Sequence, residues 1–210
     1  MKTLKLGIML LALLLAGMVF VPAVSAAATT AGKVMNLTST PEQIAKINEL
    51  KGKNITVGEY FEQVQPDLLV GMPEDLKEKL YTVKWVWPDS ATPTVNILSP
   101  NAANAWSVTC SGNTPTKVSS VINFSGSASC SGGIPYYMAF ATYLENSANQ
   151  IVAQTGQTGF SVTSVANYNM WQPNVQSGTF HTYTTAFIIT PGNNQEIDAL
   201  PRTSSSITWP

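Results

Sequence analysis

Residues 122–130 read Ile-Asn-Phe-Ser-Gly-Ser-Ala-Ser-Cys, and this alternation decides the fold. Apolar or small residues occupy every even position, and Asn or Ser occupies every odd one. A period of two is typical of a β-strand with one buried face. Residues 106–110, Trp-Ser-Val-Thr-Cys, alternate in the same way, so Cys110 and Cys130 both fall on the inward side of their strands. We therefore expect two half-buried strands that each carry a cysteine into the core.

Further strands are expected towards the C-terminus, because apolar runs of strand length recur there between turn residues. Residues 136–144 are apolar on both faces, which indicates a central strand that is covered on each side. The other expected strands are residues 150–155, 160–165, 180–190 and 206–209. No stretch of helical period interrupts the series, so the expected fold class is mainly β, an antiparallel β-sandwich.

A small helical region is expected within residues 27–89. Residues 40–43, Thr-Pro-Glu-Gln, combine an N-cap hydroxyl, a proline at the first helical position and a glutamine at N3. Thr56 and Glu59 repeat the capping-box spacing, and a third helix is expected to begin near residues 72–75. Helices this short are not stable alone. They must pack on each other or on the strands, either as an adaptor or as a cap that only adds stability.

Charge divides the chain near residue 90. Residues 90–195 contain only Lys117 and Glu145 as formal charges, and Ser, Thr, Asn and Gly dominate their polar positions. The Pro-rich stretch 87–93 suits a linker. We expect a domain boundary at residues 89/90, followed by a strand domain at residues 90–210.

The low overall charge excludes one class of partner. Charged residues make up 11% of the chain and the formal net charge is −1, whereas about 25% is usual for a soluble domain. Nucleic-acid binding depends on a strongly basic surface. We expect no nucleic-acid partner.

The first 26 residues have the features of a signal peptide. Lys2 and Lys5 precede an apolar run at residues 6–21, and Pro22 ends that run. The small residues of Val-Ser-Ala at 24–26 predict cleavage after residue 26, with an uncleaved membrane anchor as the alternative. The expected location is outside the cytoplasm, either secreted or in the cell envelope. No second long apolar run follows, so no membrane span is expected in the mature chain.

Export has consequences for covalent chemistry. Cys110 and Cys130 are the only cysteines, and exported proteins escape the cytosolic thiol pool, so a buried disulfide between them is expected. A simple hairpin at Gly112 would not bring the two together, so the bridge is expected between non-adjacent positions. The N-x-S/T sequons at Asn36, Asn54 and Asn123 are candidate glycosylation sites; they are short enough to arise by chance.

Two segments of the strand domain resemble extracellular modules. Residues 121–128, Val-Ile-Asn-Phe-Ser-Gly-Ser-Ala, resemble the second strand of immunoglobulin-like and PKD-type domains. Residues 178–184, Gly-Thr-Phe-His-Thr-Tyr-Thr, are similar to their penultimate strand. The resemblance covers about residues 94–210 and implies an immunoglobulin-like sandwich. It implies no functional residue, because the characteristic turn of PKD modules and the wide cysteine spacing of antibody domains are both missing.

Few residues suit catalysis. His181 is the only histidine, and the charge-poor sequence around it offers no acidic partner for a Ser-His-Asp site. Glu145 is isolated until Glu196, although Glu145 with Gln154 or Gln172 would match the residue types of a glutamic acid peptidase. Residues 193–198 are rich in oxygen ligands but lack the spacing of a calcium loop, so they are interpreted as a solvated turn. No cofactor and no metal site are expected.

Aromatic residues are the remaining indication of function. Tyr168 and Trp171 are expected in a loop, where exposed aromatic side chains can contact sugars or proteins. The leading hypothesis is a non-catalytic binding or adhesion module whose ligand is a glycan or an envelope protein. The alternatives are a secreted hydrolase, either acid peptidase or glycan-acting, and an envelope subunit that self-associates through strand edges.

Overall fold

The computed structural model describes residues 32–87, 106–173, 177–192, 195–198 and 205–209, with only the backbone for 195–198. The expected signal peptide and most of the expected linker lie outside these residues. The described parts all belong to one compact unit, Ala31–Pro210, on both sides of the expected boundary at 89/90. No helix in the described ranges is long and apolar enough to cross a membrane.

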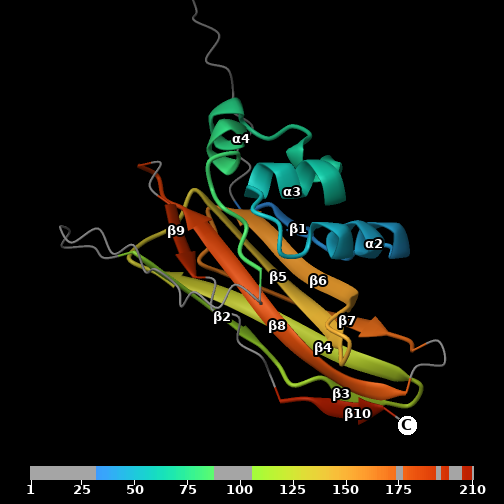
Figure 1. Ribbon diagram of the computed structural model, residues 1–210. Helices are drawn as coiled ribbons and strands as arrows, with labels where there is room; N and C mark the ends of the chain where they lie inside the picture. Colours follow the sequence, from blue (N-terminus) through green and yellow to red (C-terminus); the bar gives the residue numbers. More distant parts are fainter. Residues whose placement is uncertain (1–31, 88–105, 174–176, 193–194, 199–204, 210) are drawn as a thin grey trace, which may run out of the picture. The chain divides into compact units, whose positions relative to one another are not determined.

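Two antiparallel sheets form the body of the molecule (Figure 1). The six-stranded major sheet has the order β1 (Val34–Asn36), β6 (Ile151–Phe160), β5 (Tyr137–Asn146) and β8 (Gly178–Ile189). Strands β9 (Gln195–Asp198) and β10 (Ile207–Trp209) both pair with β8. The major sheet therefore combines strands from the C-terminal half of the chain with β1 from the N-terminal half.

The minor sheet has four strands built around β4 (Val121–Ser131). Strands β2 (Ser107–Gly112) and β3 (Thr116–Val118) pair with β4 in succession, and β7 (Ser164–Trp171) also pairs with it. The strand orders β2-β4-β7 and β6-β5-β8-β9 match the A-B-E and C′-C-F-G orders of immunoglobulin-like sandwiches. The expected fold class, a mainly β antiparallel sandwich with a small N-terminal helical region, is confirmed.

A helical layer covers the face of the major sheet that is turned away from the minor sheet. It consists of α2 (Pro41–Leu50), α3 (Val57–Val64), the 3₁₀ helix η1 (Pro66–Leu69) and α4 (Glu74–Leu80). Both expected capping boxes are present, since Thr40 and Thr56 each accept a hydrogen bond from the N3 backbone amide. The layer and the sheet share one apolar core that includes Ile47, Phe61, Leu76, Tyr137 and Tyr143.

Strand β5 is buried along its whole length, as its apolar composition predicts. Tyr137, Ala139 and Tyr143 face the helical layer. Phe140 and Leu144 point the other way, into the cores shared with the minor sheet. A strand that is covered on both faces carries mostly apolar residues, and its buried polar side chains need partners.

Three expectations about these strands are wrong. The glycines at positions 156 and 159 were expected to separate two short strands, but β6 runs through both. Gly156 marks a close approach, because a Cβ there would lie 2.4 Å from the backbone oxygen of Phe140 on β5. Tyr168 and Trp171 lie on strand β7, which spans Ser164–Trp171, and not in a loop, and residues 195–198 form strand β9, not a turn.

Side-chain amides join the edges of β7 and β6. Asn167 Nδ2 donates to the carbonyl of Gly156 at 2.9 Å, and Asn169 Nδ2 donates to that of Gln154 at 3.1 Å. Their Oδ1 atoms accept from the backbone amides of Tyr168 and Met170. Backbone groups at this edge are therefore satisfied within the chain, which disfavours pairing with a second copy here.

We expect the double substitution Asn167→Ala and Asn169→Ala to expose this edge. It removes the amide bonds to β6 and uncaps two backbone amides, so the free energy of unfolding should fall by about 2 kcal/mol. Urea denaturation measures the loss, and size-exclusion chromatography at rising concentration measures self-association. Ser164→Ala, at an exposed position of the same strand, is the control. A double variant as stable and as monomeric as this control would show that the amides do not protect the edge.

Candidate functional site

Hydroxyl groups line the outer face of the minor sheet, the face turned away from the sandwich core. Neighbouring side chains on β2 and β4 hydrogen bond across the strands, because the register places them opposite each other. The pairs are Ser107–Ser131 at 2.8 Å, Thr109–Ser129 at 3.2 Å and Ser111–Ser127 at 3.0 Å. Strands β2, β4 and β7 contain no charged residue. The outer face is therefore polar and neutral.

Two large side chains stand out on this face. Tyr168 is 67% exposed and Met170 is 57% exposed, both from β7. The register places Tyr168 beside Ser125 and Met170 beside Asn123 of β4. Tyr168, expected to contribute to recognition, is thus presented to solvent on the sheet face.

A hollow of about 240 Å³ lies beside Tyr168. It lies where β4 passes from its pairing with β2 to its pairing with β3, and where the backbone amide of Asn113 donates to the carbonyl of Ser125 at 3.0 Å. Its lining includes Asn113, Thr116, Asn123, Phe124, Ser125 and Tyr168. Asn113 Nδ2 donates to Ser125 Oγ at 2.7 Å, and the Asn113 carbonyl accepts from Thr182 Oγ1 at 2.8 Å. The crossing segment is thereby held by both sheets.

One lining residue has an unsatisfied polar atom. Oδ1 of Asn123 is shielded from solvent and has no hydrogen-bond partner among the described residues. The charged residue nearest to Asn123 in the sequence is Lys117 on β3. Its Nζ lies over the ring of Trp209, 4.8 Å from the ring centroid. The hollow therefore combines an aromatic ring with neutral polar groups.

Trp171 does not belong to this face. It lies three residues after Tyr168 on the same strand, so its side chain points to the opposite side. There it packs on Phe180 with a ring-centroid separation of 5.3 Å. The two aromatics therefore do not share a loop, and a role in recognition stays a prediction for both.

The expected disulfide is also wrong, since no S–S bond joins Cys110 and Cys130. They lie on adjacent strands, but Cys110 is opposite Ala128 and Cys130 is opposite Val108. Such diagonal positions are about 7–8 Å apart, beyond the usual disulfide range. Each sulfur instead donates to a carbonyl, Cys110 to Thr184 at 3.3 Å and Cys130 to Gly133 at 3.6 Å.

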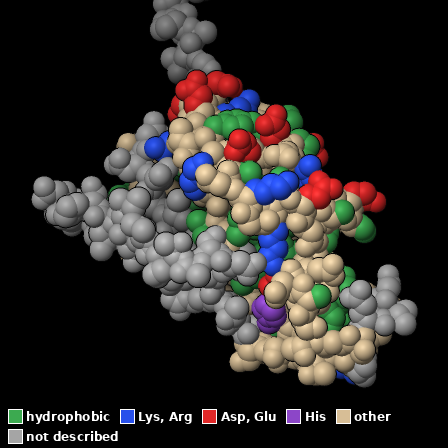
Figure 2. Space-filling model, in the orientation of Figure 1, with side chains coloured by type: hydrophobic (Ala, Val, Ile, Leu, Met, Phe, Trp, Pro, Cys, Tyr) green, Lys and Arg blue, Asp and Glu red, His purple; other side chains and the backbone are tan. Residues whose placement is uncertain are grey.

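A buried charge cluster joins the helical layer to the major sheet, and the sequence reasoning missed it. Glu145 of β5 is directly opposite His181 of β8, and His181 Nε2 lies 2.9 Å from Glu145 Oε2. Lys51, which ends α2, donates through Nζ to Glu145 Oε1 and to the carbonyl of Asn149. The side chain of Glu145 is 3% exposed. In Figure 2, charged side chains gather over the helical layer, and the purple histidine lies below them, next to a red acidic and a blue basic side chain.

The environment of Glu145 has opposing effects on its pKa. Burial raises the pKa, but the hydrogen bonds from His181 and Lys51 and the charge of Lys51 together hold it below its ordinary value of 4.5. The carboxyl is therefore ionised at neutral pH and acts as a counter-ion for Lys51. The sequence did contain an indication of this charge cluster. Glu145 directly follows the apolar run at residues 136–144, and a carboxylate buried at the end of such a run needs a partner.

The amides named as acid-peptidase candidates do not converge with Glu145. Gln154 is fully buried beneath the helical layer, where its Oε1 accepts from Ser39 at 2.5 Å and from Tyr60 at 3.2 Å. Gln172 is exposed beyond the end of β7, in the other sheet. Both Glu145 and Gln154 are engaged in structural hydrogen bonds.

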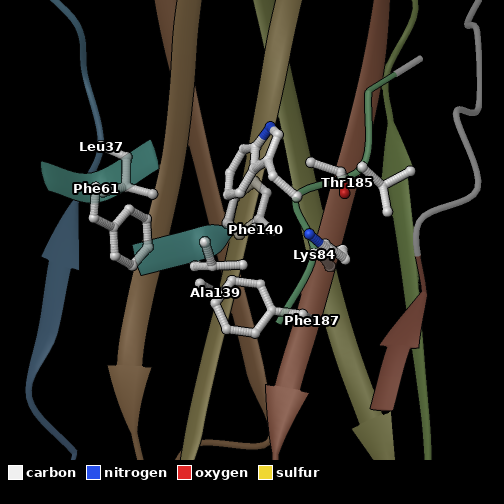
Figure 3. Close-up of a pocket in the computed structure, with 11 residues that line it drawn as sticks. Leu37, Phe61, Lys84, Ala139, Phe140, Thr185 and Phe187 are labelled. Carbon is white, nitrogen blue, oxygen red and sulfur yellow. The ribbon is translucent and has the colours of Figure 1, made fainter. Parts of the chain in front are cut away.

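An apolar pocket between the helical layer and the major sheet is too small for a ligand (Figure 3). Leu37, Phe61, Ala139 and Phe187 point into it, with Lys84 and Thr185 to one side. Its volume is about 10 Å³, about the minimum that one water molecule needs. The pocket is a packing imperfection of the core.

The three sequons lie in different settings. Asn36 on β1 and Asn54 after α2 are exposed, and Asn36 Oδ1 accepts from Gln157 Nε2 at 3.0 Å. Asn123 is half-buried in the hollow. Glycosylation at these positions stays a prediction.

Comparison with known proteins identifies no relative. No protein-family model matches the chain, and no curated protein matches it. The CARDB domain of the PF1109 protein from Pyrococcus furiosus, solved in complex with di-metal ions, matches with 11% identity and a TM-score of 0.29. The match covers 49% of this chain and 84% of the CARDB chain. A likeness this low carries no conclusion about fold or function.

Proposed function

We propose that this chain is a non-catalytic binding module that acts outside the cytoplasm and contacts its ligand through the outer face of the minor sheet. The observation that carries the proposal is the 67% exposure of Tyr168, with Met170 beside it, on a face of hydroxyl and amide groups. Large exposed side chains of this kind, rimmed by polar residues, mark interaction sites. Tyrosine suits recognition because it offers a large contact area together with a polar hydroxyl.

The arrangement of layers supports this choice of surface. The major sheet has its two faces covered by the helical layer and by the minor sheet. The outer face of the minor sheet has no such cover among the described residues, since its side chains are exposed or half-buried. The signal-peptide features of residues 1–26 support a role outside the cytoplasm.

Binding is favoured over hydrolysis. A hydrolase of the acid-peptidase type needs a carboxylate and an amide that meet in a cleft open to substrate. Glu145 and Gln154 are both buried and hold other side chains in place. The residues presented on the outer face are neutral hydroxyls, amides and an aromatic ring, which suit recognition.

Substitution of Tyr168 tests the proposal. The purified protein is screened against polysaccharides and proteins of the cell envelope, and Tyr168→Ala is expected to weaken the strongest interaction by about tenfold or more. Val70→Ala is the control, because Val70 is 79% exposed but belongs to the helical layer. Equal binding by wild type and Tyr168→Ala, or no binding by wild type, would contradict the proposal.

A further inference from the structure

The buried charge cluster around Glu145 joins the helical layer to the major sheet. One carboxylate oxygen of Glu145, on β5, lies 2.9 Å from His181 Nε2 on β8, and the other accepts from Lys51 at the end of α2. The other ion pairs between described residues lie within single helices, one in α2 and one in α4. The cluster is therefore the place where a change of charge acts between the two layers.

Two ionisable groups face Glu145 in the described part of the chain, His181 from β8 and Lys51 from α2. The turn after β5 and strand β6, residues 146–160, contain no charged residue, and neither does β10 beside β8. When the Glu145 carboxylate takes up a proton, it becomes a neutral acceptor, and hydrogen bonds to a neutral acceptor are about half as strong as those to a charged one. Proton uptake at Glu145 therefore weakens the contact between α2 and β5.

The other contacts near this end of α2 are neutral. Asn48 Nδ2 donates to the carbonyl of Ile151 at 2.8 Å, and Asn48 Oδ1 accepts from the Ile151 amide at 2.9 Å. Ile47 and Leu50 are buried in the shared core. Gly52, which follows the helix, is exposed and has open space where a side chain would lie. Loss of the charge therefore loosens the end of α2 without displacing packed side chains after it.

The packing between the two sheets has no group that responds to acid in this way. The two cores between the sheets contain no carboxylate, lysine or histidine. Glu145 and Lys117 are the only formal charges in residues 90–195. Proton uptake therefore acts on the joint with α2 and leaves the contact between the sheets unchanged.

From these contacts we infer that Glu145 is a pH-sensitive latch: when its carboxylate takes up a proton, the C-terminal end of α2, residues 47–51, opens from the major sheet while the two sheets stay packed. Such a local opening is possible because single elements can open at a lower free energy than the whole domain. The latch does not depend on the proposed function, since Tyr168 lies on the minor sheet.

Hydrogen–deuterium exchange at pH 7 and pH 3 tests the latch, with labelling times scaled to the intrinsic exchange rate at each pH. The pKa of Glu145 is below 4.5 in the folded chain, so the contact is complete at pH 7 and is lost as the pH falls through that pKa. In wild type, the amide protection of residues 47–51 should fall from pH 7 to pH 3 by about tenfold more than that of β4.

Two variants separate the latch from a general loosening of the helix. Glu145→Gln should show reduced protection of residues 47–51 at both pH values, with no further loss in acid. Asn48→Ala removes the neutral contact to Ile151, so it should lower protection at both pH values and keep the difference between them. The latch is wrong if residues 47–51 of wild type lose no more protection than β4, or if Glu145→Gln keeps the full pH dependence of wild type.

Discussion

Replacing Glu145 with glutamine is expected to lower the free energy of unfolding by about 2 kcal/mol at pH 7, because it removes the charge from a buried carboxylate that accepts hydrogen bonds from Lys51 and His181. Lys51 Nζ donates to the Glu145 carboxylate, and the side chain of Lys51 is only 11% exposed. Glutamine keeps the size of the side chain and an acceptor for His181. The loss therefore reports the charge itself, and urea denaturation of the two proteins measures it.

A second variant distinguishes charge pairing from packing. Lys51→Met combined with Glu145→Gln removes both charges, so a double-mutant cycle with the two single variants isolates the coupling between the two side chains. Glu49→Gln is the matched surface control, because the Glu49 side chain is 63% exposed in its pair with Lys46. That change should stay within about 0.5 kcal/mol. A loss below about 1 kcal/mol in Glu145→Gln would show that the cluster does not hold α2 to the sheet.

The difference between wild type and Glu145→Gln should depend on pH in one direction. The pKa of Glu145 is lower in the folded chain than its ordinary value of 4.5. The stabilisation from its ionised form is therefore complete above the unfolded pKa and is lost as the pH falls through the folded one. Urea midpoints of both proteins should differ most above about pH 5 and converge below about pH 4.5. A difference that grows as the pH falls would contradict this assignment.

Gly156→Ala is expected to destabilise the protein by about 3 kcal/mol through overpacking. The added Cβ would lie 2.4 Å from the backbone oxygen of Phe140. Phe140 belongs to β5, which is paired on both sides, so its backbone cannot move away without breaking the hydrogen bonds to β6 or β8. Thermal and urea denaturation would measure the loss.

Gly159→Ala on the same strand is the control. Its Cβ would lie 2.6 Å from Val162 Cγ2, a side-chain atom that can rotate away. Its cost should be about 1 kcal/mol. If the two alanine variants were equally stable, the close approach of β6 to β5 at Gly156 would be wrong.

The local patterns were sufficient to predict several elements. The capping boxes at Thr40 and Thr56 were correct because each involves atoms only three residues apart. The alternation in β4 was correct because a strand at the surface of a sandwich must direct alternate side chains inwards. Both inferences depend on neighbours in sequence.

The glycines of β6 and the aromatics of β7 were misread for a common reason. Gly156 has the local character of a turn residue, but its conformation is set by the backbone of β5. Tyr168 and Trp171 have the local character of a loop, but pairing with β4 makes the segment a strand and sends the two side chains to opposite faces. Pairing with distant strands outweighed local propensity.

The sequence by itself determined which residues are apolar and alternate, that residues 90–195 are almost uncharged, and where the helices begin. Only the tertiary structure decided which neutral face stays exposed around Tyr168. It also decided that the partners of Glu145 are His181 and Lys51, which are 36 and 94 residues away from it in the sequence. The reason is physical: propensity and periodicity act between near neighbours, whereas strand register is fixed by the packing of both sheets together.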